Sequence, residues 1–237
     1  MKKKIRILIT GSKGFVGSSL TKYLKRKKKL IILNDDKEKF DLSKSKKFKQ
    51  LLILTNPHYV IHLAARTVSG ISTNYENKMQ IRNTYKPVVN LITNIKNCKN
   101  LKKIIFVGSI EEYGISKRPF KESFKEKPTS SYGRYKLKSF KYVKKRLKNK
   151  EIDYIWLRPS LMFGPNDNNL RFLGTIFNSV KNEEKFKVNL GNQIRDYLYI
   201  EDFNRFVFHY LLKKDFFKLN LLNITNENWV TLRSILN

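Results

Sequence analysis

The chain has 237 residues, of which 41% are hydrophobic and 13% aromatic, so it is long and apolar enough to form a hydrophobic core. Its 50 lysines and arginines against 19 acidic residues give a net charge of +31. Because the basic residues are dispersed and no nucleic-acid-binding motif occurs, biased residue usage explains this charge better than a specific nucleic-acid partner.

Cysteine content and hydropathy indicate where such a chain works. The single cysteine, Cys98, excludes an internal disulfide, and together with three scattered histidines it makes no metal-binding pattern. No apolar run reaches the about 20 residues of a membrane span, and the N-terminus does not resemble a signal peptide. We therefore expect a cytoplasmic protein without a metal site.

The first motif is an apolar strand followed by a glycine-rich turn and the beginning of a helix. Glycines follow residues 4–10 at positions 11, 14 and 17. In such a turn the first glycine permits the sharp bend, the second lets the backbone approach a pyrophosphate, and the third lets the helix pack on the strand. The N–H groups at the helix start favour phosphate. We predict a nucleotide-binding turn formed by Gly11, Gly14, Phe15, Val16 and Gly17.

The next strand, residues 30–35, ends in Asp35, which lies 18 residues after Gly17. This is close to the about 20 residues expected before a carboxylate that hydrogen-bonds the adenosine ribose of NAD. A carboxylate repels the 2′-phosphate of NADP. However, Lys13 and Lys37 are placed either to meet such a phosphate or to face solvent. NAD is therefore the expected cofactor, with NADP as the alternative.

The following segment continues the predicted cofactor groove. Asp41 is placed to approach the adenine edge or, with Ser43, to cap the next helix. After a strand, the small residues Ala64 and Ala65 would let the backbone lie against the cofactor. His62 is expected to pack within this strand rather than to bind a ligand. Residues 66–79 are expected to form a polar loop before a helix at about 80–97.

A candidate catalytic pair follows the next strand, residues 103–107. Ser109 comes just after that strand, where ligands bind in parallel sheets, whereas Glu112 is expected in a loop. Tyr132 and Lys136 are four residues apart, on one face of a helix that continues to about Lys148. A lysine at this distance can lower the pKa of the phenol, although the spacing alone is common in a lysine-rich chain.

Strand and helix patterns alternate to the end of the chain. They predict a strand at 154–159, a turn at 163–165, a helix from about residue 170 and another through Leu212. The alternation implies an α/β fold with a Rossmann-like, doubly wound parallel sheet. We expect residues 1–158 to form the dinucleotide-binding domain, followed by a smaller part formed by residues 159–237.

The motifs as an ordered set resemble the extended short-chain dehydrogenase/reductase superfamily, namely its NAD-dependent epimerase/dehydratase family, which acts on nucleotide sugars. The resemblance covers nearly the whole chain. Its motifs are residues 10–17, Asp35, Asp41-Leu42, His62-Leu63-Ala64-Ala65, Asn83, Gly108-Ser109, Tyr113-Gly114, Tyr132 with Lys136, Leu157-Arg158-Pro159, residues 163–165, and Arg195-Asp196-Tyr197 with Asp202.

The resemblance implies roles for residues of this site. Tyr132 would be the general base or acid, Lys136 would assist it and bind the nicotinamide ribose, and Ser109 would hold the reacting oxygen. Arg195 would meet the substrate diphosphate, or else pair with Asp196 or Asp202. The resemblance also implies a nucleotide-sugar substrate and a homodimer that forms through the helices near 80–97 and 132–148. It further implies that the cofactor is bound by Leu42, Leu63, Ala64 and Ala65, and that Glu111 contacts the substrate.

Departures from the family pattern narrow the expected chemistry. Dehydratases of the family carry Asp-Glu where this chain has Ile110 and Glu111, and enzymes that epimerise C3 and C5 have cysteine at the position of Glu111. Hydride transfer at a sugar C4 remains, either 4-epimerisation or reduction of a 4-keto sugar. The chain stops at Asn237, where family members usually continue into a lid, so the resemblance implies that residues 159–237 are a partial, shortened substrate-binding region within a single family domain. The alternative is therefore a cofactor-binding protein with impaired catalysis.

Overall fold

The strands expected from the sequence form a six-stranded sheet in the computed structural model, which describes residues 4–67, 73–116, 119–148, 150–167, 172–185, 191–212 and 219–236. The strand order is β2-β1-β3-β4-β5-β8, and every neighbouring pair is parallel. The strands are β1 (Ile5–Thr10), β2 (Leu30–Asn34), β3 (Tyr59–His62), β4 (Lys103–Val107), β5 (Asp153–Pro159) and β8 (Leu221–Ile224). The predicted doubly wound, Rossmann-like fold is confirmed.

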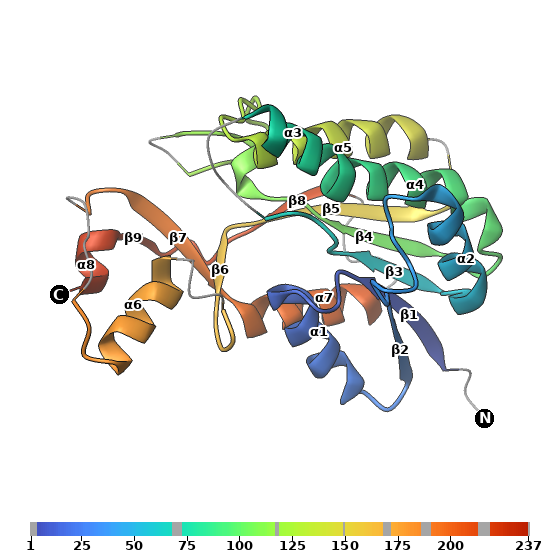
Figure 1. Cartoon of the computed structure of the whole chain (residues 1–237), viewed down its shortest axis with the longest axis horizontal. Coiled ribbons are helices and arrows are strands. Elements are labelled where there is room, and N and C mark those ends of the chain that lie inside the picture. The colour runs from blue at the N-terminus through green and yellow to red at the C-terminus, as the bar shows by residue number, and fades with distance from the viewer. Residues whose placement is uncertain are drawn as a thin grey trace.

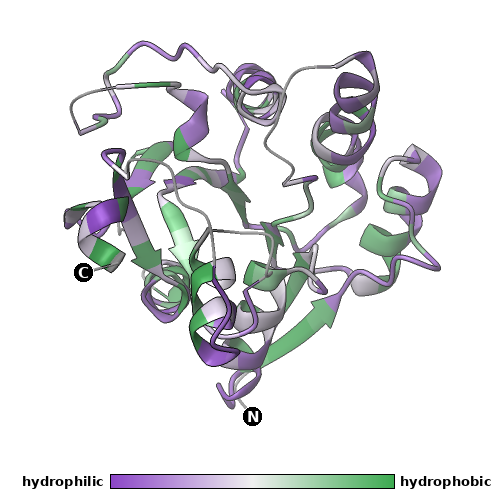
Figure 2. Cartoon of the chain, turned by 60° about the vertical axis from the view of Figure 1, so that its left-hand side comes forward, coloured by the Kyte–Doolittle hydropathy of each residue, from purple (hydrophilic) through white to green (hydrophobic). Residues whose placement is uncertain are grey.

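Helices cover both faces of this sheet (Figure 1). One face carries α2 (Ser45–Thr55), α4 (Lys86–Asn94) and α5 (Ser131–Leu147), and the other carries α1 (Phe15–Lys25) and α7 (Ile200–Leu212). Because both faces are covered, the central strands are rich in hydrophobic residues, and green predominates along the strands in Figure 2. Every helix within the described ranges is too short or too polar to span a bilayer.

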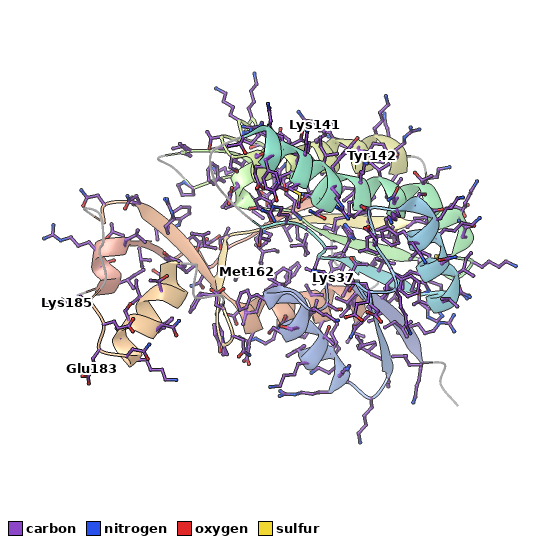
Figure 3. All side chains as sticks on the ribbon, viewed as in Figure 1. Lys37, Lys141, Tyr142, Met162, Glu183 and Lys185 are labelled. Atoms are coloured by element: carbon purple, nitrogen blue, oxygen red, sulfur yellow. The ribbon has the colours of Figure 1, made fainter. Side chains whose placement is uncertain are left out.

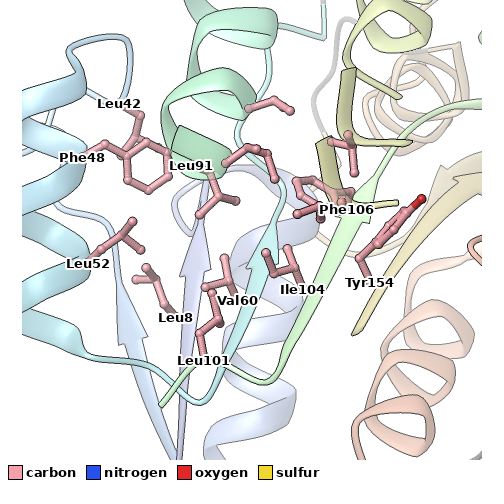
Figure 4. Close-up of a cluster of buried hydrophobic side chains, with 14 of the residues drawn as sticks. Leu8, Leu42, Phe48, Leu52, Val60, Leu91, Leu101, Ile104, Phe106 and Tyr154 are labelled. Atoms are coloured by element: carbon pink, nitrogen blue, oxygen red, sulfur yellow. The ribbon is translucent and has the colours of Figure 1, made fainter. Parts of the chain in front are cut away.

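Two hydrophobic clusters fill the space between the layers. Figure 4 shows the cluster under α2 and α4, where Phe48 and Leu52 meet Leu8, Val60 and Leu91. The other cluster lies under α1 and α7 and includes Leu20, Leu24, Phe203 and Val207. Alternate residues of each strand contribute to opposite clusters: Ile7 and Ile9 face one, and Leu8 faces the other. This packing holds the carboxyl ends of β1, β3 and β4 in a fixed row.

The helix expected near residue 80 begins earlier than predicted. α3 (Asn74–Gln80) runs into a π-helical turn, η1 (Ile81–Tyr85), then into α4 and a final 3₁₀ turn, η2 (Ile95–Asn97). The end of the predicted polar loop is therefore helical. Two polar residues of α3 are buried and hydrogen-bonded instead of facing water: Glu76 and Gln80 are 7% and 0% exposed, and Gln80 Nε2 donates to Glu76 and to the Arg66 carbonyl. Residues 68–72 of this loop lie outside the described residues.

The C-terminal part contributes to two sheets. The smaller sheet has the order β6-β7-β9, with β6 (Leu161–Phe163) parallel to β7 (Ile194–Tyr199) and β9 (Trp229–Thr231) antiparallel to it. Beside it lie α6 (Phe172–Lys181) and α8 (Leu232–Leu236), to the left in Figure 1. However, β8 pairs with β5 in the large sheet, and α7 packs on one face of that sheet. The division at residue 158 remains a prediction.

Candidate active site

The glycine turn after β1 packs directly against the end of β3. Gly11 has a φ of +74°, and a Cβ on it would lie 2.7 Å from the Ala64 backbone nitrogen. A Cβ on Gly17 would clash with the Gly11 carbonyl oxygen, whereas one on Gly14 would remain 3.3 Å from the same oxygen. The packing of the chain itself therefore requires glycine at positions 11 and 17 more strictly than at position 14.

This turn lies at the point where the strand order of the large sheet reverses. β2 pairs on one side of β1 and β3 on the other, and the Leu63 N–H continues the β3 ladder by donating to the Thr10 carbonyl at 3.0 Å. Helix α1 begins here with Gly14 as its N-cap, with no side-chain cap and no acidic residue in its first turn. Phe15, Val16 and Ala65 are half-buried around it. An uncapped helix N-terminus at such a switch point favours binding of a phosphate.

Asp35 holds the glycine turn from the end of β2. Its carboxylate accepts hydrogen bonds from the Gly11 N–H at 2.8 Å, from the Ser12 N–H at 3.1 Å and from the Ser12 hydroxyl at 2.8 Å. The side chain is 4% exposed, while Lys13 and Lys37 are exposed. The carboxylate thus orders the turn, a role that sequence spacing does not reveal. Its predicted contact with a ribose stays a prediction.

Asp41 and Leu42 face different surroundings. Asp41 accepts from the Ser43 N–H and hydroxyl and from Arg82, and the Ser43 hydroxyl is the main cause that lowers its pKa. Helix α2 has Lys44 as its N-cap without a side-chain cap, so neither Asp41 nor Ser43 caps it directly. The Leu42 side chain packs in the hydrophobic cluster of Figure 4, and its carbonyl accepts from Asn90.

A surface cavity of about 460 Å³ opens beside Asp41. It is lined by Asp41, Ser43, Lys44, Lys78, Ile81, Arg82 and Lys86. Its walls are therefore mostly basic, and the cavity lies at the Asp41 end of the predicted cofactor groove. Neither Ser109 nor Tyr132 lines it, so this cavity is separate from the candidate catalytic residues.

Ser109 begins a one-turn 3₁₀ helix, η3 (Ile110–Glu112), just after β4. Its hydroxyl accepts from the Glu111 N–H at 3.2 Å, and its own N–H donates to Glu112 Oε1 at 3.0 Å. These two bonds form a capping box that fixes the turn. Ser109 is therefore held at the carboxyl end of the sheet, as predicted from its place after the strand.

Tyr132 and Lys136 lie side by side in the first turns of α5. They are 9% and 4% exposed, and Lys136 Nζ lies 5.7 Å from the centroid of the Tyr132 ring. Lys136 also donates to the Val107 carbonyl at 2.5 Å, which ties it to the end of β4 next to the Ser109 turn. The helix start is fixed by neighbours: the Ser131 hydroxyl donates to Asn77 of α3 at 2.5 Å. The predicted adjacency of the pair is thus present.

Burial controls the ionisation of two groups here. Desolvation lowers the pKa of Lys136 to about 8, opposed by the negative charge of Glu112. Desolvation, and then the charge of Lys136, lower the pKa of His62 to about 3, so the imidazole is neutral at physiological pH. His62 hydrogen-bonds Thr10 at 2.7 Å through Nδ1 and stacks on Phe48. It is a packed strand histidine, as expected.

Sequence reasoning missed the role of Glu112. It is expected in a loop, but it is fully buried and forms an ion pair with Arg158, also fully buried, at 2.7 Å. Burial raises the pKa of Glu112, and the charge of Arg158 opposes this. The sequence contains only a weak indication of this ion pair. Arg158 lies 46 positions after Glu112, and in the sequence it stands out only as part of a strand motif.

The two predicted substrate-binding residues lie in contrasting settings. Glu111 accepts a hydrogen bond from the Ser130 hydroxyl at 2.6 Å, and Ser130 in turn caps α5 through the Gly133 N–H. Arg195 is exposed on β7 and donates to the Ile194 carbonyl. The acids proposed as its alternative partners bond elsewhere: Asp196 accepts from the Asn226 N–H and Asp202 pairs with Arg205.

Residues 7–224 match the NAD dependent epimerase/dehydratase family, so the chain belongs to this family and the predicted resemblance is confirmed. It is 27% identical to the dTDP-D-glucose 4,6-dehydratase of Dictyostelium discoideum, covering 83% of this chain and 53% of that protein. It is 29% identical to the UDP-glucose 4-epimerase of Vibrio cholerae, covering 67% of this chain and 52% of that protein. The chain thus spans about half the length of these two relatives.

Solved structures of the family share the fold. The UDP-glucuronic acid 4-epimerase from Bacillus cereus, in complex with UDP-glucuronic acid and NAD, superposes with a TM-score of 0.84 at 22% identity. The match covers 98% of this chain and 81% of that chain. A UDP-glucose 4-epimerase from Thermotoga maritima, with UDP-glucose, also gives 0.84 at 22% identity, covering 98% and 80%.

Proposed function

We propose that the chain is an NAD(P)-dependent enzyme that transfers hydride at C4 of a nucleotide-linked sugar, as a 4-epimerase or a 4-keto reductase. The observation that carries the proposal is the buried pair of Tyr132 and Lys136, tied to the Ser109 turn at the carboxyl end of β4. Membership of the family supports the reaction class. The relatives named for UDP-, dTDP- and other nucleotide sugars support the substrate class.

The glycine turn fits a dinucleotide. Internal packing requires glycine at positions 11 and 17, but it requires glycine less strictly at position 14. A ligand that approaches the backbone at position 14 would explain why this residue, too, is glycine. The pyrophosphate would lie on Gly14, Phe15 and Val16 at the uncapped start of α1. Leu63, Ala64 and Ala65 would line the groove, with Asp35, Asp41 and Leu42 toward the adenosine.

We favour NAD over NADP because the Asp35 carboxylate would repel a 2′-phosphate. The exposed Lys13 and Lys37 keep NADP as the alternative. When bound, the nicotinamide supplies the acceptor or donor of the hydride. The remaining steps belong to the chain itself.

Tyr132 would remove the proton of the C4 hydroxyl, or return it in the reverse direction. Lys136, positively charged below its pKa of about 8, would stabilise the phenolate and hold the nicotinamide ribose. The Ser109 hydroxyl would hold the reacting oxygen. Arg195, which is exposed on β7, would bind the substrate diphosphate, and Glu111 would contact the sugar.

Dehydration fits these residues poorly, even though one relative is a 4,6-dehydratase. Ile110 stands at the position of the dehydratase aspartate, and an alkyl side chain cannot protonate a leaving hydroxyl. The neighbouring Glu111 accepts from Ser130 and so holds the helix that carries Tyr132. Hydride transfer at C4 therefore agrees better with the residues of this site than dehydration does.

The test combines binding and turnover. Calorimetry with NAD and NADP, followed by a screen of nucleotide sugars and 4-keto sugars, would identify cofactor and substrate. Tyr132→Phe should lower kcat by about 100-fold or more, the usual contribution of general acid–base catalysis, while NAD binding persists. Tyr135→Phe is the matched control, since Tyr135 is half-buried on the same helix and its ring lies under Lys138 Nζ.

Full turnover by Tyr132→Phe would refute the assigned mechanism. NAD binding by the wild-type chain without reaction across the screen would instead favour the cofactor-binding protein with impaired catalysis.

A further inference from the structure

A buried carboxylate lies directly behind the Ser109 turn. Glu112 Oε1 accepts from the Ser109 N–H at 3.0 Å and from Trp156 Nε1 at 2.9 Å, and Oε2 accepts from Arg158 Nε at 2.7 Å. Glu112 and Arg158 are both 0% exposed. Arg158 is itself held by Glu126 at 3.0 Å and lies over the rings of Tyr113 and Phe140.

The neighbouring backbone is shaped around this carboxylate. A Cβ on Gly108 would clash with both Glu112 Oε1 and Trp156 Nε1, so the hydrogen bond between these two side chains occupies the space beside Gly108. The turn from β4 to Ser109 is therefore packed against the Glu112 carboxylate and hydrogen-bonded to it. Any shift of Glu112 would move the Ser109 N–H, and with it the hydroxyl that is bonded to the Glu111 N–H.

Glu112 is also the acid that opposes a second cation. Among described groups, those that act on Lys136 are Glu112 from η3, His62 from β3 and the Tyr132 ring on its own helix. Since His62 is neutral, Glu112 supplies the negative charge that Lys136 faces. Arg158 and Lys136 thus share one carboxylate, while Glu126 and Tyr113 also contact Arg158.

Stability alone does not account for such an arrangement. A buried ion pair often stabilises a fold no better than well-packed hydrophobic residues of the same volume, because both charges lose their hydration. In this chain the Glu112 carboxylate accepts from the Ser109 N–H, and its charge opposes the effect of desolvation on Lys136. The position of the ion pair is explained if it holds Ser109 and Lys136 in the arrangement that the reaction needs.

We propose that Glu112 is a positioning residue of the active site: anchored by Arg158 and Trp156, it fixes the backbone of Ser109 and balances the charge of Lys136. The proposal rests on the proposed function, because it assigns a purpose to the same site. Glu112 touches neither substrate nor cofactor and acts only through Ser109 and Lys136.

The decisive variant is Glu112→Gln, which keeps the shape and an acceptor for the Ser109 N–H but removes the charge. Its matched control is Glu126→Gln, which removes the other carboxylate of Arg158 without any contact to Ser109 or Lys136. Thermal unfolding and circular dichroism of both would be followed. The primary readout is the affinity for NAD, measured by calorimetry from pH 6 to 9, and it does not depend on turnover.

We expect the NAD affinity of the wild type to fall as the pH rises and Lys136 loses its proton. In Glu112→Gln this fall should move to lower pH by about one unit, the size of shift expected for loss of a nearby opposite charge. With a substrate in hand, kcat should drop about 10-fold or more at nearly unchanged KM, as for a misplaced reacting group. Glu126→Gln should retain the wild-type profile.

The outcomes are distinguishable. A wild-type chain that binds neither NAD nor NADP would overturn the proposed function and this proposal with it. Wild-type binding with an unchanged pH profile in Glu112→Gln, or an equal shift in Glu126→Gln, would overturn the positioning role alone. If Glu112→Gln does not fold, Trp156→Phe keeps the charge but loses one anchor of the carboxylate. It should lower kcat in the same direction, and unchanged kcat would contradict the proposal.

Discussion

At the scale of single residues, burial separates the ionisation of side chains that lie close together. His62 and Lys136 are both almost fully buried, yet one is neutral and the other charged at neutral pH. The difference arises mainly because the ordinary pKa of an amine, 10.5, lies well above that of an imidazole, 6.5, and desolvation lowers both. The charge of Glu112 partly offsets the loss at Lys136, whereas the charge of Lys136 lowers the pKa of His62 further.

The depressed pKa of His62 predicts that the fold loses stability in mild acid. Between pH 6.5 and about 3 the unfolded chain binds a proton at this position that the folded chain cannot bind, so the free energy of unfolding falls as the pH falls. At pH 5 the loss is about 2 kcal/mol. Urea denaturation at pH 7.5 and pH 5 measures it.

The control for this prediction is the exposed His209. His62→Gln should flatten the difference between the two pH values, and His209→Gln should leave it as in the wild type. An equal loss in wild type and His62→Gln would show that other groups cause the acid sensitivity.

At the scale of elements, the unit of β1, glycine turn and α1 allows packing and ligand binding to be separated. Gly17→Ala places a Cβ against the Gly11 carbonyl oxygen and should destabilise the fold by about 1–3 kcal/mol, as for an overpacked site. Gly14→Ala meets that oxygen at 3.3 Å with an ordinary φ of −77°, so stability should change by less than about 1 kcal/mol.

Of these two variants, Gly14→Ala has the smaller expected effect on stability, but it should have a clear effect on NAD binding. Gly14→Ala should weaken NAD binding although it folds like the wild type, because the methyl group stands where the pyrophosphate approaches. Calorimetry beside thermal unfolding makes the comparison. Wild-type NAD affinity in Gly14→Ala would argue against a phosphate at this turn.

Local elements of this kind were predictable because their determinants are close in sequence. The apolar strand, the glycine spacing and Asp35 after β2 specify the turn, and the alternation of patterns specifies the sheet. α3 was missed because its polar residues look solvent-exposed until their partner Arg66 is known. Glu112 was missed for the same reason, since its burial depends on Arg158 and Trp156 from β5. The candidate pair Tyr132–Lys136 needed only helix periodicity.

At the scale of the whole molecule, the net charge of +31 affects association more than folding. Basic side chains project around the outline of the molecule in Figure 3, which also labels Lys141 and Tyr142 on α5. On the outer side of η1 and α5, cations cover tyrosine rings: Lys138 Nζ lies 4.7 Å from the centroid of Tyr85, and Arg146 lies over Tyr142. These are the helices through which we expect a homodimer.

Two such faces repel each other, so the expected homodimer should depend on salt. At about 0.01 M salt the Debye length is about 30 Å and both faces interact unscreened, whereas at about 0.1 M it falls to about 10 Å. The dimer fraction in sedimentation experiments should therefore rise with salt across this range. Lys141→Glu, on the exposed surface of α5, should raise the dimer fraction at low salt. Lys25→Glu makes the same change of net charge on α1, in the opposite layer, and should raise the dimer fraction less. Because both variants change the net charge equally, an equal effect on the dimer fraction would show that the interface does not lie on α5.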